Sequence, residues 1–231
     1  LFEKYRKTVL AIATHRSFLQ NRIMSTVYLS TAYFAPVSYY ASFLRYDRIV
    51  IEQWCNYTKQ TYRNRCHIAG ANGLLALSVP IVKPDTIKCP TKDIRISDHG
   101  EWRHLHWNAI ASAYGSSPFF EYYQDDIRPF FEKRYEFLLD FNEEIRRTVC
   151  NLIGLEPHIE YSSSYSEPAP GETDLRDAIH PKKRKAETIL PVQPKPYYQV
   201  FSEKYGFQPD LSIIDLLMNM GPESILILQN A

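Results

Sequence analysis

Two short apolar segments with a helical segment between them constrain the fold of this chain most. Residues 27–30 and 48–52 are rich in β-branched and aromatic side chains, which is typical of strands. Between them, Pro36 suits the first turn of a helix, and apolar side chains then recur at helical spacing through Leu44. A strand, a helix and a second strand in this order predict a right-handed parallel crossover. We therefore expect an α/β fold, with mixed α+β as the alternative.

The rest of the chain predicts a small, mainly parallel or mixed sheet followed by a helical half. Further strands are expected over residues 74–82 and 94–96. Two helices are expected next, the first over residues 102–114 and the second from a cap at Asp125 or Asp126 to Gly154. The first of these helices has apolar side chains on two faces, which predicts that it is largely buried.

The last helix, expected over residues 213–220, carries its own start and stop signals. Ser212 and Asp215 predict a capping box at its start, and Gly221-Pro222 predicts a sharp end. The apolar residues 225–228 then predict either a closing strand or a short helix, because their length decides neither.

The predicted domain organisation is a single unit over residues 25–222. Residues 1–24 have no helix cap and weak periodicity, so we interpret them as a non-native or frayed extension; a genuine amphipathic helix is the competing interpretation. Residues 157–196 hold seven of the fifteen prolines, together with serines and the Lys182-Lys183-Arg184-Lys185 tetrad. This composition predicts a mobile loop. Residues 223–231 are expected to be a tail.

Composition excludes several classes of function. The net charge of +1 creates no global field that would draw the chain to nucleic acid or to acidic membranes. No apolar run approaches the roughly 18 residues of a membrane span. The four cysteines match no zinc or redox spacing and predict reduced thiols in a cytoplasmic protein. No phosphate-binding glycine loop and no Gly-x-Ser-x-Gly elbow occurs, so we predict no cofactor and no metal.

The most informative polar feature is the run from Tyr57 to Arg65, which we call the basic–aromatic run. Lys59, Arg63 and Arg65 place three cations within seven residues, and the run also holds Tyr57 and Tyr62 but no acid. Arginine offers a planar fork to phosphate or carboxylate, and tyrosine offers a stacking face. The run predicts a site for a phosphorylated or nucleotide-linked ligand. The alternative is a loop whose arginines pair with Glu132, Glu143 and Glu144.

A histidine on the expected helix 102–114 is the second candidate. His106 shares a stripe with Trp102 and Ala109, which predicts a satisfied core histidine. The functional alternative is a general base at a pocket wall, which a near-neutral intrinsic pKa allows. His104 and His106 point to different sides of a helix, so they do not predict a metal site.

Several blocks, in register over about residues 25–222 apart from the Pro-rich loop, resemble the WbqC-like family of bacterial proteins. The matching residues are Tyr33 and Pro36, Tyr57-x-Lys59-Gln60-x-Tyr62-Arg63-Asn64-Arg65, Leu77-Ser78-Val79-Pro80-Ile81, Trp102-x-x-x-His106-Trp107-Asn108, Ala113-Tyr114, Ser117-Pro118-Phe119-Phe120-x-Tyr122, and the segment from Leu211 to Pro222. The resemblance implies a cytoplasmic role in making or decorating an activated sugar for bacterial surface polysaccharide (O-antigen). Many members carry Gln-Pro after the first strand and paired Asp after the second, where this chain has Ser30-Thr31-Ala32 and Glu52-Gln53.

Three functions compete. The first is a transferase acting on a nucleotide-linked sugar or an acyl donor, with His106 as its base. Its expected ligand-binding residues are Tyr33, Tyr57, Lys59, Gln60, Tyr62, Arg63, Asn64, Arg65, Trp107, Tyr114, Tyr122, Asp215 and Asn219. The second is a non-catalytic partner of a biosynthetic enzyme, because the chain has many aromatic residues and no recognised catalytic motif. The third is nucleic-acid binding, which the near-neutral net charge disfavours.

Overall fold

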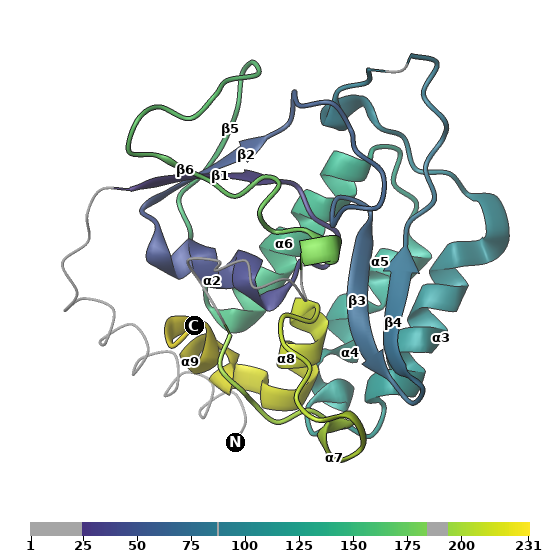
Figure 1. Cartoon of the computed structure of the whole chain (residues 1–231). Helices are drawn as coiled ribbons and strands as arrows, with labels where there is room; N and C mark the ends of the chain where they lie inside the picture. The colour runs from purple at the N-terminus through teal and green to yellow at the C-terminus, as the bar shows by residue number, and fades with distance from the viewer. Residues whose placement is uncertain (1–24, 87, 184–193) are drawn as a thin grey trace.

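The computed structural model describes residues 25–86, 88–183 and 194–231, and it begins with the predicted parallel crossover (Figure 1). Strand β1 (Thr26–Ser30) leads through helix α2 (Val37–Arg45) to strand β2 (Arg48–Glu52). The two strands pair in parallel, with Val27 opposite Ile49. The prediction of a βαβ unit is therefore confirmed. The expected extension over residues 1–24 lies outside the described residues.

The main sheet has four parallel strands in the order β5-β2-β1-β6. Strands β5 (Ile159–Tyr161) and β6 (Thr173–Asp174) both come from the segment that we expected to be a loop. The segment predicted to be a mobile loop thus contributes two short strands, because its backbone pairs with β2 and β1 although it has few apolar side chains. Its mobility stays a prediction, and its residues 184–193 lie outside the described residues.

A second, two-stranded antiparallel sheet consists of β3 (Arg65–Gly70) and β4 (Gly73–Ser78). The strand expected over residues 74–82 ends early. Pro80 follows, and it has no backbone N–H to extend the pairing. The strand expected over residues 94–96 is reduced to isolated bridges, one of them between Ile81 and Ile96. Strand β3 was not predicted.

Four helices follow this hairpin: α3 (Trp102–Tyr114), α4 (Phe120–Ile127), α5 (Pro129–Glu132) and α6 (Leu138–Ile153). Helix α3 packs against β3, and α5 joins α3 to α4 (Figure 1). The single long helix expected from Asp125 or Asp126 is wrong at its start. Residues 133–137 leave the helix, because Ile96 N–H donates to Glu136 O and Leu138 N–H donates to Ile94 O. Gly154, with φ of 79°, ends α6 as predicted.

The C-terminal part contains α7 (Ser202–Tyr205), α8 (Ile213–Met220) and α9 (Ser224–Gln229). Ser212 caps α8 by accepting from Ile214 N–H. The reciprocal half of the expected capping box is absent, because the carboxylate of Asp215 points to other partners. Residues 225–228 form the short helix rather than the strand. This helix packs beside α2 with Ile225 and Leu228 buried, so it belongs to the packed fold and is no free tail.

Aromatic residues occupy much of the core where these layers meet. The largest fully buried side chains include Tyr33, Tyr40, Tyr114, Tyr123 and Phe141. Tyr33 stacks on Phe141, which joins the segment after β1 to α6. The high tyrosine content of the chain thus serves packing first. Within the described residues, no helix has the length and apolar character that crossing a bilayer requires.

Candidate functional site

The polar side chains of interest gather at the carboxyl ends of the parallel strands. The chain runs from β1 to β2 to β5 in one direction and then returns to place β6 on the other side of β1. Open α/β sheets bind ligands at the carboxyl edge where such a reversal occurs. We call this region the carboxyl-edge site. It comprises Ser30, Thr31, Glu52, Cys55, Arg63, Ser162 and Arg176.

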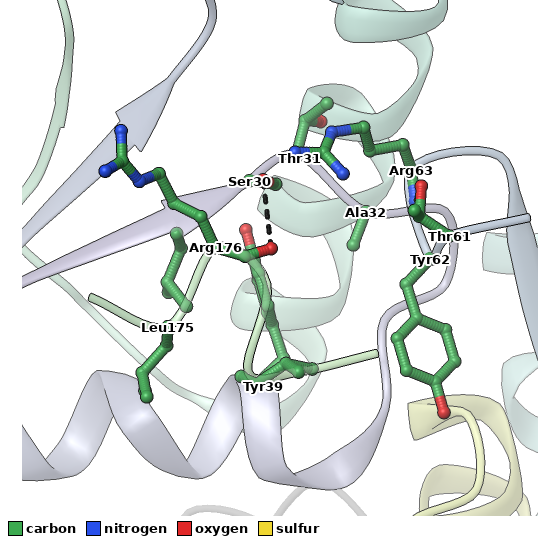
Figure 2. Close-up of a pocket in the computed structure, with 11 residues that line it drawn as sticks. Ser30, Thr31, Ala32, Tyr39, Thr61, Tyr62, Arg63, Leu175 and Arg176 are labelled. Carbon is green, nitrogen blue, oxygen red and sulfur yellow. Dashed lines mark hydrogen bonds between the residues drawn. The ribbon is translucent and has the colours of Figure 1, made fainter. Parts of the chain in front are cut away.

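A narrow pocket opens at this edge between the end of β1, the basic–aromatic run and the chain after β6 (Figure 2). Its empty space, open mouth included, is about 260 Å³. The lining residues are Leu29, Ser30, Thr31, Ala32, Tyr39, Thr61, Tyr62, Arg63, Leu175, Arg176 and Ile179. The inner part suits a group no larger than a small anion. A larger ligand would therefore have to extend outward or displace the chain after β6.

Buried charge is concentrated at the same edge. Among the described residues, seven acidic or basic side chains are buried, and five of them are Glu52, Arg63, Glu143, Arg146 and Arg176. A buried charge is costly unless it is paired and hydrogen-bonded. A buried charge that has close hydrogen-bonded partners is therefore structural, whereas one with few partners can bind a ligand.

Glu52, the last residue of β2, organises the turn that follows it. Its Oε1 accepts from Trp54 N–H at 2.6 Å, from Cys55 N–H at 3.2 Å and from Ser162 Oγ at 3.0 Å. Its Oε2 is buried without a hydrogen bond within the described part of the chain, and Arg176 Nη1 lies 3.9 Å away. Glu52 thus sets the direction in which the basic–aromatic run leaves the sheet.

Arg176 is a structural charge. Its Nε and Nη2 donate to the carboxylate of Asp174 at 2.9 and 2.6 Å, and Nη2 also reaches Glu167 at 3.2 Å. Nη1 donates to Ser166 O at 3.1 Å. Because its donors are used in this way, Arg176 connects Ser166 and Glu167, which follow β5, to Asp174 in strand β6.

Glu143 and Arg146 form a second structural pair, which attaches α6 to the strand ends. Arg146 Nε donates to Glu143 Oε2 at 2.7 Å, and the hydroxyl of Tyr161 donates to the same oxygen at 2.8 Å. Thr31 Oγ1 lies 3.5 Å from Glu143 Oε1. The proximity of Glu143 raises the pKa of Arg146 against its burial, so this guanidinium stays charged.

Arg63 differs from both, although it is only 4% exposed. The carboxylate oxygen that its guanidinium approaches belongs to Asp177, 3.9 Å away on a side chain that is 81% exposed. Nη2 donates to Cys55 Sγ at 3.5 Å, and Nε is buried without a hydrogen-bond partner within the described part of the chain. Figure 2 shows this guanidinium beside Thr31, while that of Arg176 points away from it. Arg63 is therefore a buried cation with weak compensation.

The alternative in which the arginines of the run pair with three named acids is wrong. Glu132 pairs with Arg128, Glu143 with Arg146 and Glu144 with Lys133. Those acids have cationic partners outside the basic–aromatic run.

The residues of the basic–aromatic run do not all face the pocket. Tyr62 and Arg63 line the pocket, and Lys59 and Gln60 are exposed in the preceding turn, where Gln60 has φ of 61°. Tyr57 is half-buried, and its burial raises its pKa to about 12 although Arg63 and Arg65 oppose this.

The last two residues of the run turn toward the hairpin. Asn64 donates to Val79 O at 2.8 Å, and Arg65 Nε donates to Ser78 Oγ at 2.9 Å. The run as a whole therefore does not face the pocket; Thr61, Tyr62 and Arg63 are the residues of the run that line it.

His106 lies in an aromatic cluster and does not line this pocket. Its Nδ1 is 2.9 Å from the hydroxyl of Tyr33, and its ring packs against Trp102. Burial lowers the pKa of His106 to about 4, although a hydrogen bond to the backbone of Ser78 opposes the shift. The ring is therefore neutral at pH 7.

Three further predicted site residues form a cluster between α3 and α8. Asp215 accepts from the hydroxyls of Tyr114 at 2.9 Å and Tyr197 at 2.8 Å, and from Gln199 Nε2 at 2.9 Å. Asn219 donates to the main-chain oxygen of Asp215 at 2.8 Å. Burial raises the pKa of Asp215 to about 6 against these bonds. The cluster attaches the C-terminal part of the chain to α3.

Trp107 and Tyr122 lie elsewhere on the surface. Trp107 stacks on Phe120 and borders an open groove of about 950 Å³ with Arg103 and Arg128. Tyr122 is 39% exposed on α4. Neither residue lines the carboxyl-edge pocket.

Comparisons with known proteins identify the family of this chain. A family model described as the WbqC-like protein family matches residues 31–227. The chain belongs to the WbqC-like family. It is also 25% identical to the uncharacterised protein Rv1507c of Mycobacterium tuberculosis over 214 residues, which are 83% of this chain and 89% of that protein. No solved structure matches the chain.

In this WbqC-like chain the family match begins at Thr31, directly after β1, and runs into α9, so it covers every residue of the carboxyl-edge site except Ser30. Sequence reasoning did not place Cys55 and Arg176 there. Arg176 was missed because its segment was expected to be a loop. Glu52 could have been given more weight, since a carboxylate that directly ends a buried parallel strand lies at the edge where ligands bind.

Proposed function

We propose that this WbqC-like protein binds a phosphorylated or nucleotide-linked small molecule through Arg63 at the carboxyl-edge site. The supporting observation is the weak compensation of this buried guanidinium, whose Nε has no hydrogen-bond partner among the described residues. A planar guanidinium with an unused N–H donor matches an oxygen of a phosphate or carboxylate. An anion in the pocket would supply the charge partner that Arg176 and Arg146 already have.

The reaction class that this binding serves best is group transfer from an activated donor, a nucleotide-linked sugar or an acyl donor. The family resemblance implies a cytoplasmic role in bacterial surface-polysaccharide (O-antigen) biosynthesis, and we adopt that role as part of the proposal. The narrow pocket supports entry of the anionic group alone. The rest of the donor would then lie over the exposed turn with Lys59 and Gln60.

A thermal-shift screen tests the anion site. The probes are inorganic phosphate, pyrophosphate, nucleotide-linked sugars and acyl-carrier thioesters, added to wild type, Arg63→Met and Arg95→Met. Arg95 is the matched control, because its side chain is 60% exposed. At a probe concentration of about 100 Kd, we expect the melting temperature of wild type and the control to rise by roughly 5–10 °C. A rise of the same size in Arg63→Met would reject the site.

A non-catalytic role in a biosynthetic complex is the second candidate, and one observation favours it. Leu74 and Leu75 on β4 are 44% and 40% exposed, and within the described residues β4 pairs with β3 alone. An exposed apolar edge strand can accept a strand from a partner. Purification from a native host should then recover a stoichiometric enzyme with wild type and lose it with Leu75→Asp. Turnover by the isolated chain would count against this role.

A further inference from the structure

The four cysteines of the chain differ sharply in their surroundings. Cys66 and Cys150 are buried, and burial raises the pKa of both thiols, for Cys150 to about 12. Cys89 is half-buried, and its Sγ lies 3.6 Å from Pro90 O; burial and the nearby Asp93 raise its pKa. Cys55 is also half-buried, and it receives a hydrogen bond from Arg63 at the carboxyl-edge site; Cys150 has a similar bond from Arg146 but is buried.

The backbone of Cys55 is held from both sides. Its N–H donates to Glu52 Oε1, and its carbonyl oxygen accepts from the N–H and the hydroxyl of Thr91, both at 2.9 Å. Asn56 and Pro90 form an antiparallel bridge next to this contact. The position of the sulfur therefore does not depend on a flexible loop.

The sulfur itself is oriented by two groups. Thr91 Oγ1 lies 3.4 Å from Sγ, and its own hydrogen is used on Cys55 O, so this oxygen can accept the thiol proton's hydrogen bond. Arg63 Nη2 donates to the sulfur at 3.5 Å. Cysteine attacks a carbonyl as its thiolate, and a guanidinium N–H directed at the sulfur is placed to hydrogen-bond to that form.

A second observation, independent of the cysteine, indicates that a ligand group belongs beside it. Arg63 is 4% exposed and its Nε has no hydrogen-bond partner within the described residues, while Nη2 of the same guanidinium contacts Sγ. A ligand oxygen bound at Nε would lie on the guanidinium that also contacts the sulfur. A carbonyl oxygen of an acyl group fits such a donor.

We propose that Cys55 is a nucleophile that accepts an acyl group from a thioester donor bound at Arg63. The thiolate of Cys55 attacks the acyl carbonyl carbon, the bond from that carbon to the carrier sulfur breaks, and the carrier leaves as a thiol with the proton that Cys55 gave up. An acceptor amine or hydroxyl then attacks the new thioester, the bond from the acyl carbon to the Cys55 sulfur breaks, and the acceptor's proton passes to that sulfur, which leaves the acyl group on the acceptor. No oxidant or reductant is needed. The inference rests on the proposed function for the class of donor.

Alkylation of the native full-length chain by iodoacetamide at pH 7, read cysteine by cysteine by mass spectrometry, tests the nucleophile directly. We expect Cys55 to react about tenfold faster than Cys89, and Cys66 and Cys150 to stay unmodified. Arg63→Met should slow Cys55 to the rate of Cys89, whereas Arg95→Met should leave it unchanged. Equal rates for Cys55 and Cys89 in wild type would overturn the proposal, and this comparison needs no variant to fold.

Incubation with the acetyl thioester of N-acetylcysteamine tests the acyl step. We expect one acetyl group on Cys55, removable by hydroxylamine, and none in Cys55→Ser. Acetylation of other residues alone, or none at all, would overturn the step. The melting-temperature rise of wild type with phosphate probes reports the anion site separately. If wild type shows that rise but Cys55 does not react, the anion site is supported and the nucleophile is rejected. If Cys55 reacts but no rise occurs, the nucleophile is supported and the anion site is rejected.

Discussion

Two buried arginines at the carboxyl-edge site show how surroundings decide the role of a residue type. Arg176 and Arg63 are 8% and 4% exposed, so both lose most of their hydration. In Arg176, hydrogen bonds to Asp174, Glu167 and a main-chain oxygen replace the lost contacts with water. Arg63 has a distant carboxylate and a sulfur. Since an uncompensated buried charge is unfavourable, a ligand anion stabilises Arg63 and adds little at Arg176.

At the same scale, His106 should make stability depend on pH. Its pKa of about 4 in the folded protein lies below the usual 6.5, so protonation favours the unfolded chain. The stability that this neutral ring contributes is fully present above pH 6.5 and is lost as pH falls toward 4, by about 3 kcal/mol in total. Urea unfolding of wild type and His106→Gln across pH 4–8 measures it.

The wild-type free energy of unfolding should fall relative to that of His106→Gln as the solution is acidified, because the glutamine does not titrate. The difference between the two free energies of unfolding cancels the contributions of the other titratable groups, which are present in both proteins. Parallel curves for the two proteins would contradict the low pKa.

At the scale of elements, several pieces of this fold are too short to be stable alone. Strand β6 has two residues, β5 has three and α9 has six. Isolated helices shorter than about 12 residues are marginal in water, and short strands need neighbours. These elements exist because β1, β2 and α2 offer paired backbone groups and apolar surface to them.

Helix α9 allows a matched test of this dependence. Leu228 is 2% exposed, whereas Leu226 on the same helix is partly buried. Leu228→Ala should lower the free energy of unfolding by about 2–4 kcal/mol, since it opens a cavity against the core. Leu226→Ala, the control, should cost clearly less in the same urea titration. Equal losses would mean that α9 does not pack on α2 as described.

At the scale of the whole molecule, the segment between β5 and α7 returns over the carboxyl edge and forms one wall of the pocket (Figure 2). Leu175 and Ile179 line the pocket from this side, and Ser30 Oγ donates to Arg176 O at 3.4 Å. Access of a large donor to Arg63 therefore depends on how firmly this segment is attached.

Arg176→Met should loosen the segment, because it removes the charge that joins Ser166 and Glu167 to Asp174 in strand β6. We expect cleavage after Glu167 or Glu172 by a glutamate-specific protease to become at least about tenfold faster, since each 1.4 kcal/mol lost from local stability raises the open fraction tenfold. Arg95→Met is the exposed control, and its cleavage rate should match wild type. Unchanged cleavage of Arg176→Met would show that other contacts hold the segment.

The sequence by itself determined the first half of this architecture. The spacing of apolar residues predicted β1, α2 and β2, and the sequence also predicted the buried stripe of α6 and its end at Gly154. These features could be predicted because local periodicity and backbone preferences depend on neighbouring residues. The cations of the basic–aromatic run were visible for the same reason. Their directions were not, since Arg63 and Arg65 are two residues apart and contact different elements.

Only the tertiary structure decided the rest. Residues 159–161 and 173–174 became strands through pairing with distant backbone, and residues 133–137 left the expected helix through bonds to residues 94–96. The carboxyl-edge site joins Glu52 and Arg63 to Arg176, which lies more than a hundred residues later in the chain. Partners and burial, which separate a structural arginine from one open to a ligand, arise from long-range contacts that no local pattern encodes.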